Sequence, residues 1–490
     1  MAKLDDLIEM TYAKCASWLD RDEEGNMVLV DPIEGKVIGH HYSLSHFAAA
    51  AICGFPDDST RFRMGLEVLH GVLARWHRDS LVPGFHNDFN TFALVLIHDE
   101  LEMRGICSGE RAKIEQTVLK TRDSDHDTVN WLPMRLMADV ARTRWGRDNS
   151  REANACRKKI ARAVNSDGLI EDRLPRGTSF NLQYDISSVA LLDYVETCDI
   201  EQPVDLDRAY GAITACALPD GDVNYLGRGC NQVFAWGPWV YLLKRRGTES
   251  EQISGLGYLL SHLPDMLDNN NILLNDQPGL SRDMWWDYHY CSVYTAHLLM
   301  WLVLARRARH VRNMKGQTSG AIGQTGVKIT RNADAMVVTF SGRREYLAES
   351  GPEIAAIWTR RDGVINKGAF GPWLGAFGRS HATASVLLNH FGLLAMHGGL
   401  RNSIMPLHAL SEVKIVDDEL LISFRIKRRQ WACMNLPLFN NVVPEHVQVS
   451  AHGSPVLMRR IGSLMTQYGL VPLYQTNPAK ACDWLVKISL

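Results

Sequence analysis

The sequence predicts a multidomain protein that is helical in its N-terminal part and mainly β in its C-terminal part. Apolar, helix-like segments recur six times in the first three hundred residues, and short alternating segments separated by turn residues fill the remainder. At 490 residues the chain also exceeds one ordinary hydrophobic core. We place the two domains at residues 1–309 and 327–490, joined by a linker at 310–326 rich in Gly, Ser, Thr and Gln.

The helical part has one recurring pattern, in which a polar or aromatic cluster leads directly into an apolar helix. The repeats start about 40 to 60 residues apart, and more charged amphipathic segments such as 59–79 and 149–165 lie between them. Apolar inner helices alternating with charged outer helices predict an (α/α) toroid of about six helical hairpins. The six apolar segments are HHYSLSHFAAAAICG (40–54), FHNDFNTFALVLIHDEL (85–101), VNWLPMRLMADVART (129–143), NLQYDISSVALLDYVE (181–196), CNQVFAWGPWVYLLKRR (230–246) and YHYCSVYTAHLLMWLVLARR (288–307).

The C-terminal part changes to short alternating runs such as VKITRNADAMVVTFSG and DWLVKISL. Such runs, separated by turn residues, predict a C-terminal antiparallel β-sandwich domain. Its basic run KRRQW (427–431) could bind an anion, but we interpret it as a solvated strand edge.

Composition excludes several classes of partner and cofactor. The 53 Lys and Arg residues nearly balance 55 Asp and Glu, and a net charge of −2 provides no field to attract nucleic acid. The ten cysteines form no CxxC pair, and no motif with metal-ligand spacing or phosphate-binding loop is present. We therefore expect reduced cysteines, no metal and no cofactor.

The chain shows neither an export signal nor a membrane span. Its first residues carry acids where a signal peptide is basic, and its longest apolar run, 296–305, is about half a span. The sequence therefore predicts a cytoplasmic location, or a secreted or periplasmic one if a leader was removed. No oligomeric state is predicted.

The clusters that precede the inner helices predict the functional site. Chain turns would gather these amino ends around one cleft, where helix dipoles favour negative charge. Helix capping would also place Asn, Asp and His here, but it does not explain the additional Tyr and Trp.

Three stretches at or before the predicted helix starts carry distinctive Arg-Gly, Tyr and Asn-Trp patterns. SDGLIEDRLPRGTSFNLQYDISSVALL (166–192) resembles an alginate-lyase stretch in which an Arg-Gly pair, here at Arg176, precedes a catalytic tyrosine, here Tyr184. VNWLPMRLMADVART resembles the Asn-Trp helix start of chondroitin and hyaluronan lyases, with Asn130 as the asparagine, and YLGRGCNQVFAW carries a further Arg-Gly pair at Arg228. Together with the predicted architecture, the chain resembles lyases of the chondroitin, hyaluronan, alginate and heparinase type.

This resemblance implies β-elimination on a polysaccharide that contains uronic acid. Negative charge then builds up on the uronate carboxylate, so neutral amide and cationic donors must face it. Asn130, supported by Arg228 or Arg176, would hold the carboxylate. Tyr184 would protonate the leaving oxygen and could also be the base, and His289 is the other candidate for proton transfer. The proposed substrate contacts are His86, Asn87, Arg176, Asn231, Trp236, Trp285 and Tyr290.

Three other functions remain open. A glycoside hydrolase on the same fold would use two carboxylates, with Asp88 and Asp185 as candidates. A uronate epimerase would begin with the same proton abstraction. A non-catalytic polysaccharide-binding protein would need no reacting group. For individual residues, capping by His86, Asn87 and Asp88 and core packing of the tryptophans are the structural alternatives.

Overall fold

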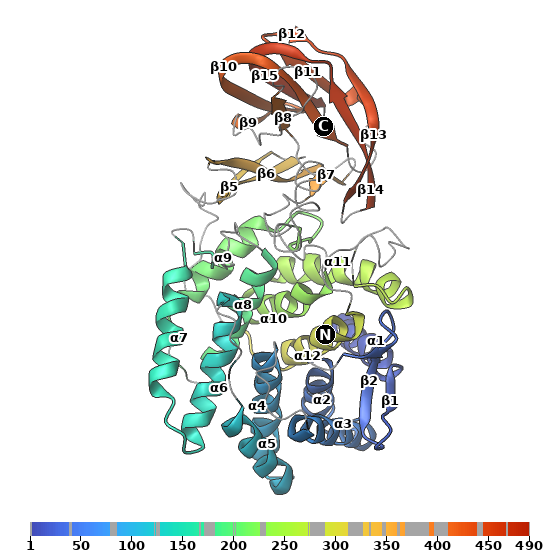
Figure 1. The fold of residues 1–490 in the computed structure, drawn as a ribbon, viewed down its shortest axis with the longest axis vertical. Coiled ribbons are helices and arrows are strands. Elements are labelled where there is room, and N and C mark those ends of the chain that lie inside the picture. Colours follow the sequence, from blue (N-terminus) through green and yellow to red (C-terminus); the bar gives the residue numbers. More distant parts are fainter. Residues whose placement is uncertain are drawn as a thin grey trace. The chain divides into compact units, whose positions relative to one another are not determined.

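The computed structural model forms two compact units (Figure 1). The first comprises residues 1–164, 184–210 and 231–316, and the second comprises 165–183, 211–230 and 317–490. Helices dominate the first unit and strands the second. Most of the predicted linker, 312–326, lies outside the described residues. Those described are 2–38, 42–78, 86–121, 123, 128–165, 168–170, 182–198, 200, 202–225, 232–272, 274, 290–311, 327–332, 335–344, 349–359, 363–367, 392–395, 410–438, 444–466 and 469–489.

The described helices alternate between buried and amphipathic. All twelve residues of α2 are buried, whereas α7 buries only Ala153, Cys156 and Ile160, which share one face of that helix. None of the described helices is long and apolar enough to cross a bilayer. The helices are α1 (Ala2–Ala16), α2 (Ser43–Gly54), α3 (Ser59–Arg78), α4 (Asn87–Met103), α5 (Ser108–Lys120), α6 (Leu132–Arg144), α7 (Ser150–Ala163), α8 (Leu182–Glu196), α9 (Leu206–Cys216), α10 (Trp236–Arg246), α11 (Glu249–Asp268) and α12 (Cys291–Arg307).

Helix α12 brings the end of the helical region back to its beginning. It packs against α1, α2 and α10, and the contacts continue from α2 to α4 and from α4 to α6. Gly237 permits the close approach of α10 to α12, because a Cβ there would lie 2.7 Å from the Cβ of Trp301. The more charged helices α3, α5 and α7 pack against α2, α4 and α6, respectively.

A small antiparallel sheet in the helical unit was not predicted from the sequence. It consists of β1 (Leu19–Arg21), β2 (Met27–Asp31) and β3 (Lys36–Val37). The buried carboxylate of Asp31 accepts hydrogen bonds from Ser292 N (2.8 Å) and Ser292 Oγ (2.7 Å) at the start of α12. Asp31 therefore caps a helix that lies more than 250 residues later in the chain.

The second unit contains two antiparallel sheets, as the sequence predicted for the C-terminal region. One has the order β4-β5-β6-β7, and the other has β12-β11-β15-β10-β14-β13, with β8 and β9 also paired to β10. Ala335 and Val337 of the first sheet share one buried apolar cluster with Ile422 and Trp484 of the second. The strands are β4 (Val327–Arg331), β5 (Ala335–Arg344), β6 (Glu349–Thr359), β7 (Gly363–Lys367), β8 (Gly392–Ala395), β9 (Leu410–Val416), β10 (Glu419–Pro437), β11 (Val447–Ala451), β12 (Ser454–Pro455), β13 (Met458–Thr466), β14 (Gly469–Thr476) and β15 (Ala479–Ser489).

A buried histidine connects α4 to α5. Both nitrogens of His98 face carboxylates: Nδ1 is 3.3 Å from Asp99, and Nε2 is 2.9 Å from Glu115 on α5. The ring also packs edge-on against Trp145. Burial alone would lower the pKa of His98, but the two carboxylates outweigh it and raise that pKa above its ordinary 6.5.

His98 should make stability depend on pH. Because its pKa is higher in the folded state, its contribution is complete below the unfolded pKa and is lost as pH rises through the folded pKa. We expect the free energy of unfolding of the wild type to fall relative to that of His98→Gln as pH rises from about 6 towards 8. Denaturant unfolding across this range measures the difference, and two parallel pH profiles would contradict the prediction.

Candidate functional site

The amino ends of five helices meet in a layer of aromatic rings. Tyr42, before α2, stacks on Phe89 of α4 with a centroid distance of 4.2 Å. Phe89 also contacts Trp131, immediately before α6, and Phe234, immediately before α10, at 5.8 and 6.3 Å. Phe234 stacks on His297 of α12 at 4.2 Å. We call these five residues, together with His46, His86 and Tyr294, the ring layer.

Helix capping does not explain the composition of these helix starts. The residues before α2, α4, α6, α10 and α12 make no side-chain capping hydrogen bond. His86, for example, occupies the capping position of α4, but its ring packs against Trp131 at 5.5 Å. The aromatic residues of this region therefore form a packed layer between helices.

Two histidines face each other inside the ring layer. The Nδ1 atoms of His46 and His297 are 3.3 Å apart, and the residues are 0% and 4% exposed. Burial lowers the pKa of His46 to about 3 and lowers that of His297 well below its ordinary value. Both imidazoles are therefore neutral near pH 7, and one Nδ1–H donates to the other Nδ1.

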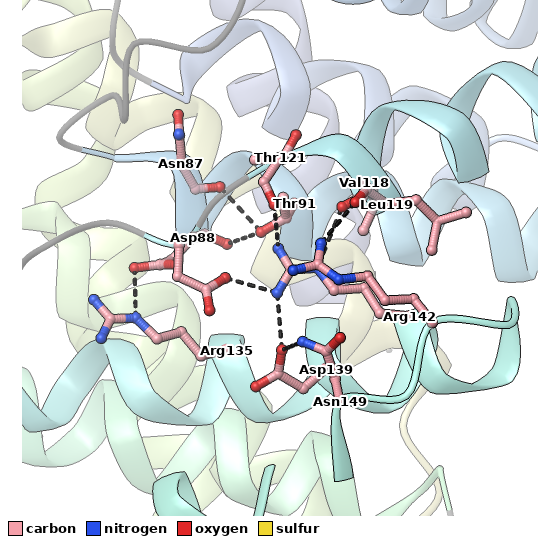
Figure 2. A network of polar contacts seen from close by, with 12 residues as sticks. Asn87, Asp88, Thr91, Val118, Leu119, Thr121, Arg135, Asp139, Arg142 and Asn149 are labelled. Carbon is pink, nitrogen blue, oxygen red and sulfur yellow. Dashed lines mark hydrogen bonds and ion pairs between the residues drawn. The ribbon is translucent and has the colours of Figure 1, made fainter. Parts of the chain in front are cut away.

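A buried ion pair lies beside the ring layer. Arg135 of α6 donates from Nε to Oδ2 of Asp88 in the first turn of α4, at 3.0 Å (Figure 2). Asp88 is 1% exposed, so its charge is compensated inside the protein. In the same view, Arg142 of α6 donates hydrogen bonds to Asp139 and to the carbonyl of Thr121. The bond to Thr121 joins α6 to the end of α5.

The segment before α6 contains unsatisfied buried polar atoms. Asn130 is 5% exposed, and its Oδ1 has no hydrogen-bond partner in the part of the chain that the structure describes. Thr128 is also buried, and within the same described ranges its Oγ1 has no partner. A buried polar atom without a partner costs about 1–3 kcal/mol, so two of them in one segment favour a role in binding a ligand.

Tyr184 and Asp185 lie in the first turn of α8. Tyr184 is partly exposed and its carbonyl accepts a hydrogen bond from Ser188 Oγ at 2.7 Å, whereas Asp185 is 0% exposed. The structure therefore places Tyr184 at the amino end of an apolar helix, as predicted.

Other predicted contacts lie near α4 and α12. Asn87 begins α4, is half-buried, and accepts a hydrogen bond from Thr91 Oγ1 on its carbonyl at 3.0 Å. Tyr290 immediately precedes α12 and is half-buried. Burial raises the pKa of Tyr290, and the charges of Glu34 and Asp31 raise it further, so its hydroxyl is protonated at neutral pH.

The structure corrects the interpretation of Trp236 as a substrate contact. Its ring has 0% exposure and stacks on Tyr258 of α11 at 4.9 Å, so it is a core residue that joins α10 to α11. The remaining predicted site residues lie outside the described part of the chain: Arg176, Arg228, Asn231, Trp285 and His289.

His46, Arg135 and His297 lie in helix segments that were predicted from the sequence, but none of the three was predicted as a site residue. The spacing of the aromatic residues could have indicated both histidines. Tyr42 and His46 are four residues apart, and Tyr294 and His297 are three apart, which are helical spacings. Each pair lies near the amino end of its helix and shares one helix face. The pairing of Arg135 with Asp88 spans 47 residues and has no local signal.

One described group has the composition of a metal site. Ligand atoms of His98, Asp99 and Glu102 lie within 4.8 Å of one another. Both nitrogens of His98 already face carboxylates, and Arg144 binds Asp99, so the group is satisfied as a network of ion pairs. It lies at the opposite end of α4 from the ring layer.

The sequence matches no protein-family model and no curated protein. Among similar solved structures, a possible GH105 member from Salmonella enterica serovar Paratyphi A is 10% identical, with a TM-score of 0.41 over 62% of this chain and 94% of that one. The GH76A α-1,6-mannanase of Salegentibacter sp. HEL1_6 is 10% identical, with a TM-score of 0.42 over 62% and 99%. A heparan sulfate lyase mutant from Pedobacter heparinus is 8% identical, with a TM-score of 0.44 over 98% and 82%. At TM-scores below 0.5, these similarities assign no activity to this chain.

Proposed function

We propose that this protein is a polysaccharide lyase that cleaves a polymer containing uronic acid by β-elimination. In this proposal the twelve helices close into an (α/α) toroid, the two sheets form a β-sandwich, and the sugar chain binds at the amino ends of the inner helices. Positive helix ends, amides and neutral imidazoles suit an anionic sugar.

The observation that carries the proposal is the buried amide of Asn130. A side-chain amide has a donor end and an acceptor end, and rotation about its last side-chain bond exchanges them. Oδ1 has no hydrogen-bond partner among the described residues, so no bond to that oxygen has to break for the N–H₂ to face a substrate carboxylate. A neutral donor prepared in advance stabilises the charge that develops on the carboxylate during proton abstraction.

The ion pair of Asp88 argues against the hydrolase alternative. A hydrolase needs one carboxyl group to protonate the leaving oxygen and another to attack or to activate water. Asp88 is 1% exposed and bound to Arg135, so its carboxylate already has a structural role. Asp185, the second candidate, is 0% exposed, whereas Tyr184 retains exposed surface.

The proposed reaction needs one base and one acid. The base takes the proton from the carbon beside the carboxylate, and the electron pair left behind forms a carbon–carbon double bond as the neighbouring glycosidic C–O bond breaks. The leaving oxygen then takes a proton from the acid. We assign the acid to the Tyr184 hydroxyl, which can also be the base if it starts as phenolate, and we retain His289 as the second candidate for the base.

Incubation with alginate, hyaluronan, chondroitin sulfate and glucuronan tests the reaction. We expect ultraviolet absorbance from the conjugated double bond to grow with one of these polymers. New reducing ends without that absorbance would instead indicate hydrolysis, and inversion of the uronate without chain cleavage would indicate an epimerase.

Tyr184→Phe should abolish the absorbance change while leaving the fold intact. Loss of a positioned acid or base lowers kcat by about 10²–10⁴-fold. Tyr194→Phe is the matched control, because Tyr194 lies in the same helix ten residues further along. Initial rates with equal amounts of each folded variant measure the effect, and equal rates for the two variants would contradict the assignment of Tyr184.

A further inference from the structure

The second unit, called the β unit below, exposes a tryptophan beside an irregularity in β10. Trp431 is 53% exposed and pairs in register with Lys480 of β15, which is also exposed. Among the described residues it is the one exposed large aromatic side chain. Its neighbour Ala432 is fully buried in the apolar core, so Trp431 lies on the outer surface of its sheet.

The irregularity is a bulge that carries basic residues. Arg425 pairs with Asp483 and Gln430 pairs with Ala481. Five steps along β10 therefore correspond to two steps along β15, so β10 contains three extra residues at this point. The segment from Arg425 to Trp431 has four Lys and Arg residues and no acidic residue. Bulges change the direction in which side chains point, and they occur often next to functional sites.

Two exposed basic residues occupy strand positions near Trp431: Arg429 lies two residues earlier in β10, and Lys480 lies opposite Trp431 in β15. Arg429 is exposed and donates from Nε to the carbonyl of Lys480 at 3.1 Å, which fixes its guanidinium beside the strand position opposite Trp431. Arg425 binds Asp483 at 2.8 Å, so its charge is compensated locally. Arg429 and Lys480 have no acidic partner among the described residues.

The charge of the C-terminal region reinforces this local pattern. Residues 327–490 contain 18 Lys and Arg against 11 Asp and Glu, a net charge of +7 in a chain whose total is −2. The first 326 residues therefore carry −9. The excess of positive charge in residues 327–490 therefore favours the approach of an anionic partner to this part of the chain.

The interpretation of 427–431 as a strand edge is wrong, because β10 pairs with β15 on one side and β14 on the other. We propose that the outer surface formed by Arg429, Trp431 and Lys480 binds an acidic polysaccharide chain. An exposed indole stacks on the apolar face of a sugar ring, and the two flanking cations pair with its carboxylate or sulfate groups. Binding of single-stranded nucleic acid uses several aromatic rings for successive bases, so one ring with two cations favours a sugar chain. The choice of a uronate polymer as ligand rests on the proposed function.

Affinity electrophoresis in gels containing hyaluronan, alginate or chondroitin sulfate tests this surface. The Asn130→Ala background slows any cleavage during the run. We expect Trp431→Ala to weaken retardation by an acidic polymer about fivefold or more, and Arg429→Ala to weaken it and reduce its dependence on salt. Leu457→Ala, which truncates another exposed side chain of the β unit, should leave retardation unchanged.

The same gels distinguish failure of the proposed binding surface from failure of the proposed lyase activity. Equal retardation of Trp431→Ala and Leu457→Ala by every acidic polymer would overturn the proposal, as would retardation by neutral dextran that matches the acidic polymers. Binding of single-stranded DNA with higher affinity than any polysaccharide would also overturn it. Loss of retardation in Trp431→Ala, combined with no double-bond product from the wild type, would support this surface while rejecting the proposed lyase activity.

Discussion

Asn130→Ala is expected to lower kcat for the elimination reaction by about 10²–10³-fold, the effect of removing one preorganised donor to a developing oxyanion. The variant should fold normally, because Oδ1 of Asn130 has no hydrogen-bond partner within the described ranges that the substitution would remove. Replacing a buried amide that lacks a partner by an apolar side chain costs little and can stabilise the fold. Steady-state rates by ultraviolet absorbance, alongside thermal denaturation, measure both effects.

Two further variants sharpen this test. Asn130→Asp has nearly the same shape but places a carboxylate against the substrate carboxylate, so we expect it to be at least as inactive as Asn130→Ala. Asn154→Ala, on the exposed surface of α7, is the control for replacing an asparagine and should retain wild-type kcat. A rate for Asn130→Ala within about twofold of wild type would remove Asn130 from the mechanism.

Asp193→Ala is expected to be the most destabilising single substitution considered. Asp193 of α8 is 0% exposed and binds both Arg245 (2.6 Å) and Arg246 of α10, and it also accepts a hydrogen bond from Tyr241. Removing the carboxylate leaves two buried guanidinium groups without this shared partner. Breaking a buried ion pair in this way costs about 3–5 kcal/mol.

Thermal and denaturant unfolding of Asp193→Ala measure that loss. Asp207→Ala is a matched control, since Asp207 also binds Arg246 but is more than half exposed. We expect Asp207→Ala to cost less than about 1 kcal/mol, the usual value for exposed ion pairs. Equal destabilisation by the two variants would contradict the assignment of Asp193 as the buried counter-ion that joins α8 to α10.

The helices and their order could be predicted from local patterns because each signal lies within about twenty residues. The predicted segment 40–54 contains α2 at Ser43–Gly54, and the segment 288–307 contains α12 at Cys291–Arg307. The change to β structure after residue 327 has an equally local signal, since alternation and turn residues are read along a single strand. The short sheet β1–β3 was missed because its strands have at most five residues.

The composition of the candidate site could be predicted only in part, because it depends on which helix starts meet. His46 and His297 are 251 residues apart, and nothing in either segment indicates that their Nδ1 atoms lie together. The prediction of Trp236 as a substrate contact failed for the same reason. An aromatic residue at a helix start can face either the site or a neighbouring outer helix, and the local sequence does not distinguish the two. In α10, Trp236 faces Tyr258 of α11.

The measurement that tests the central claim most directly is cleavage of a responsive uronate polymer in water labelled with heavy oxygen, followed by mass spectrometry of the products. Elimination breaks the glycosidic bond without adding water, so the account predicts unsaturated products whose new ends carry no label from the bond-breaking step. Controls incubated after cleavage correct for exchange at reducing ends. Saturated products that gain one labelled oxygen per cleaved bond would contradict β-elimination and establish hydrolysis.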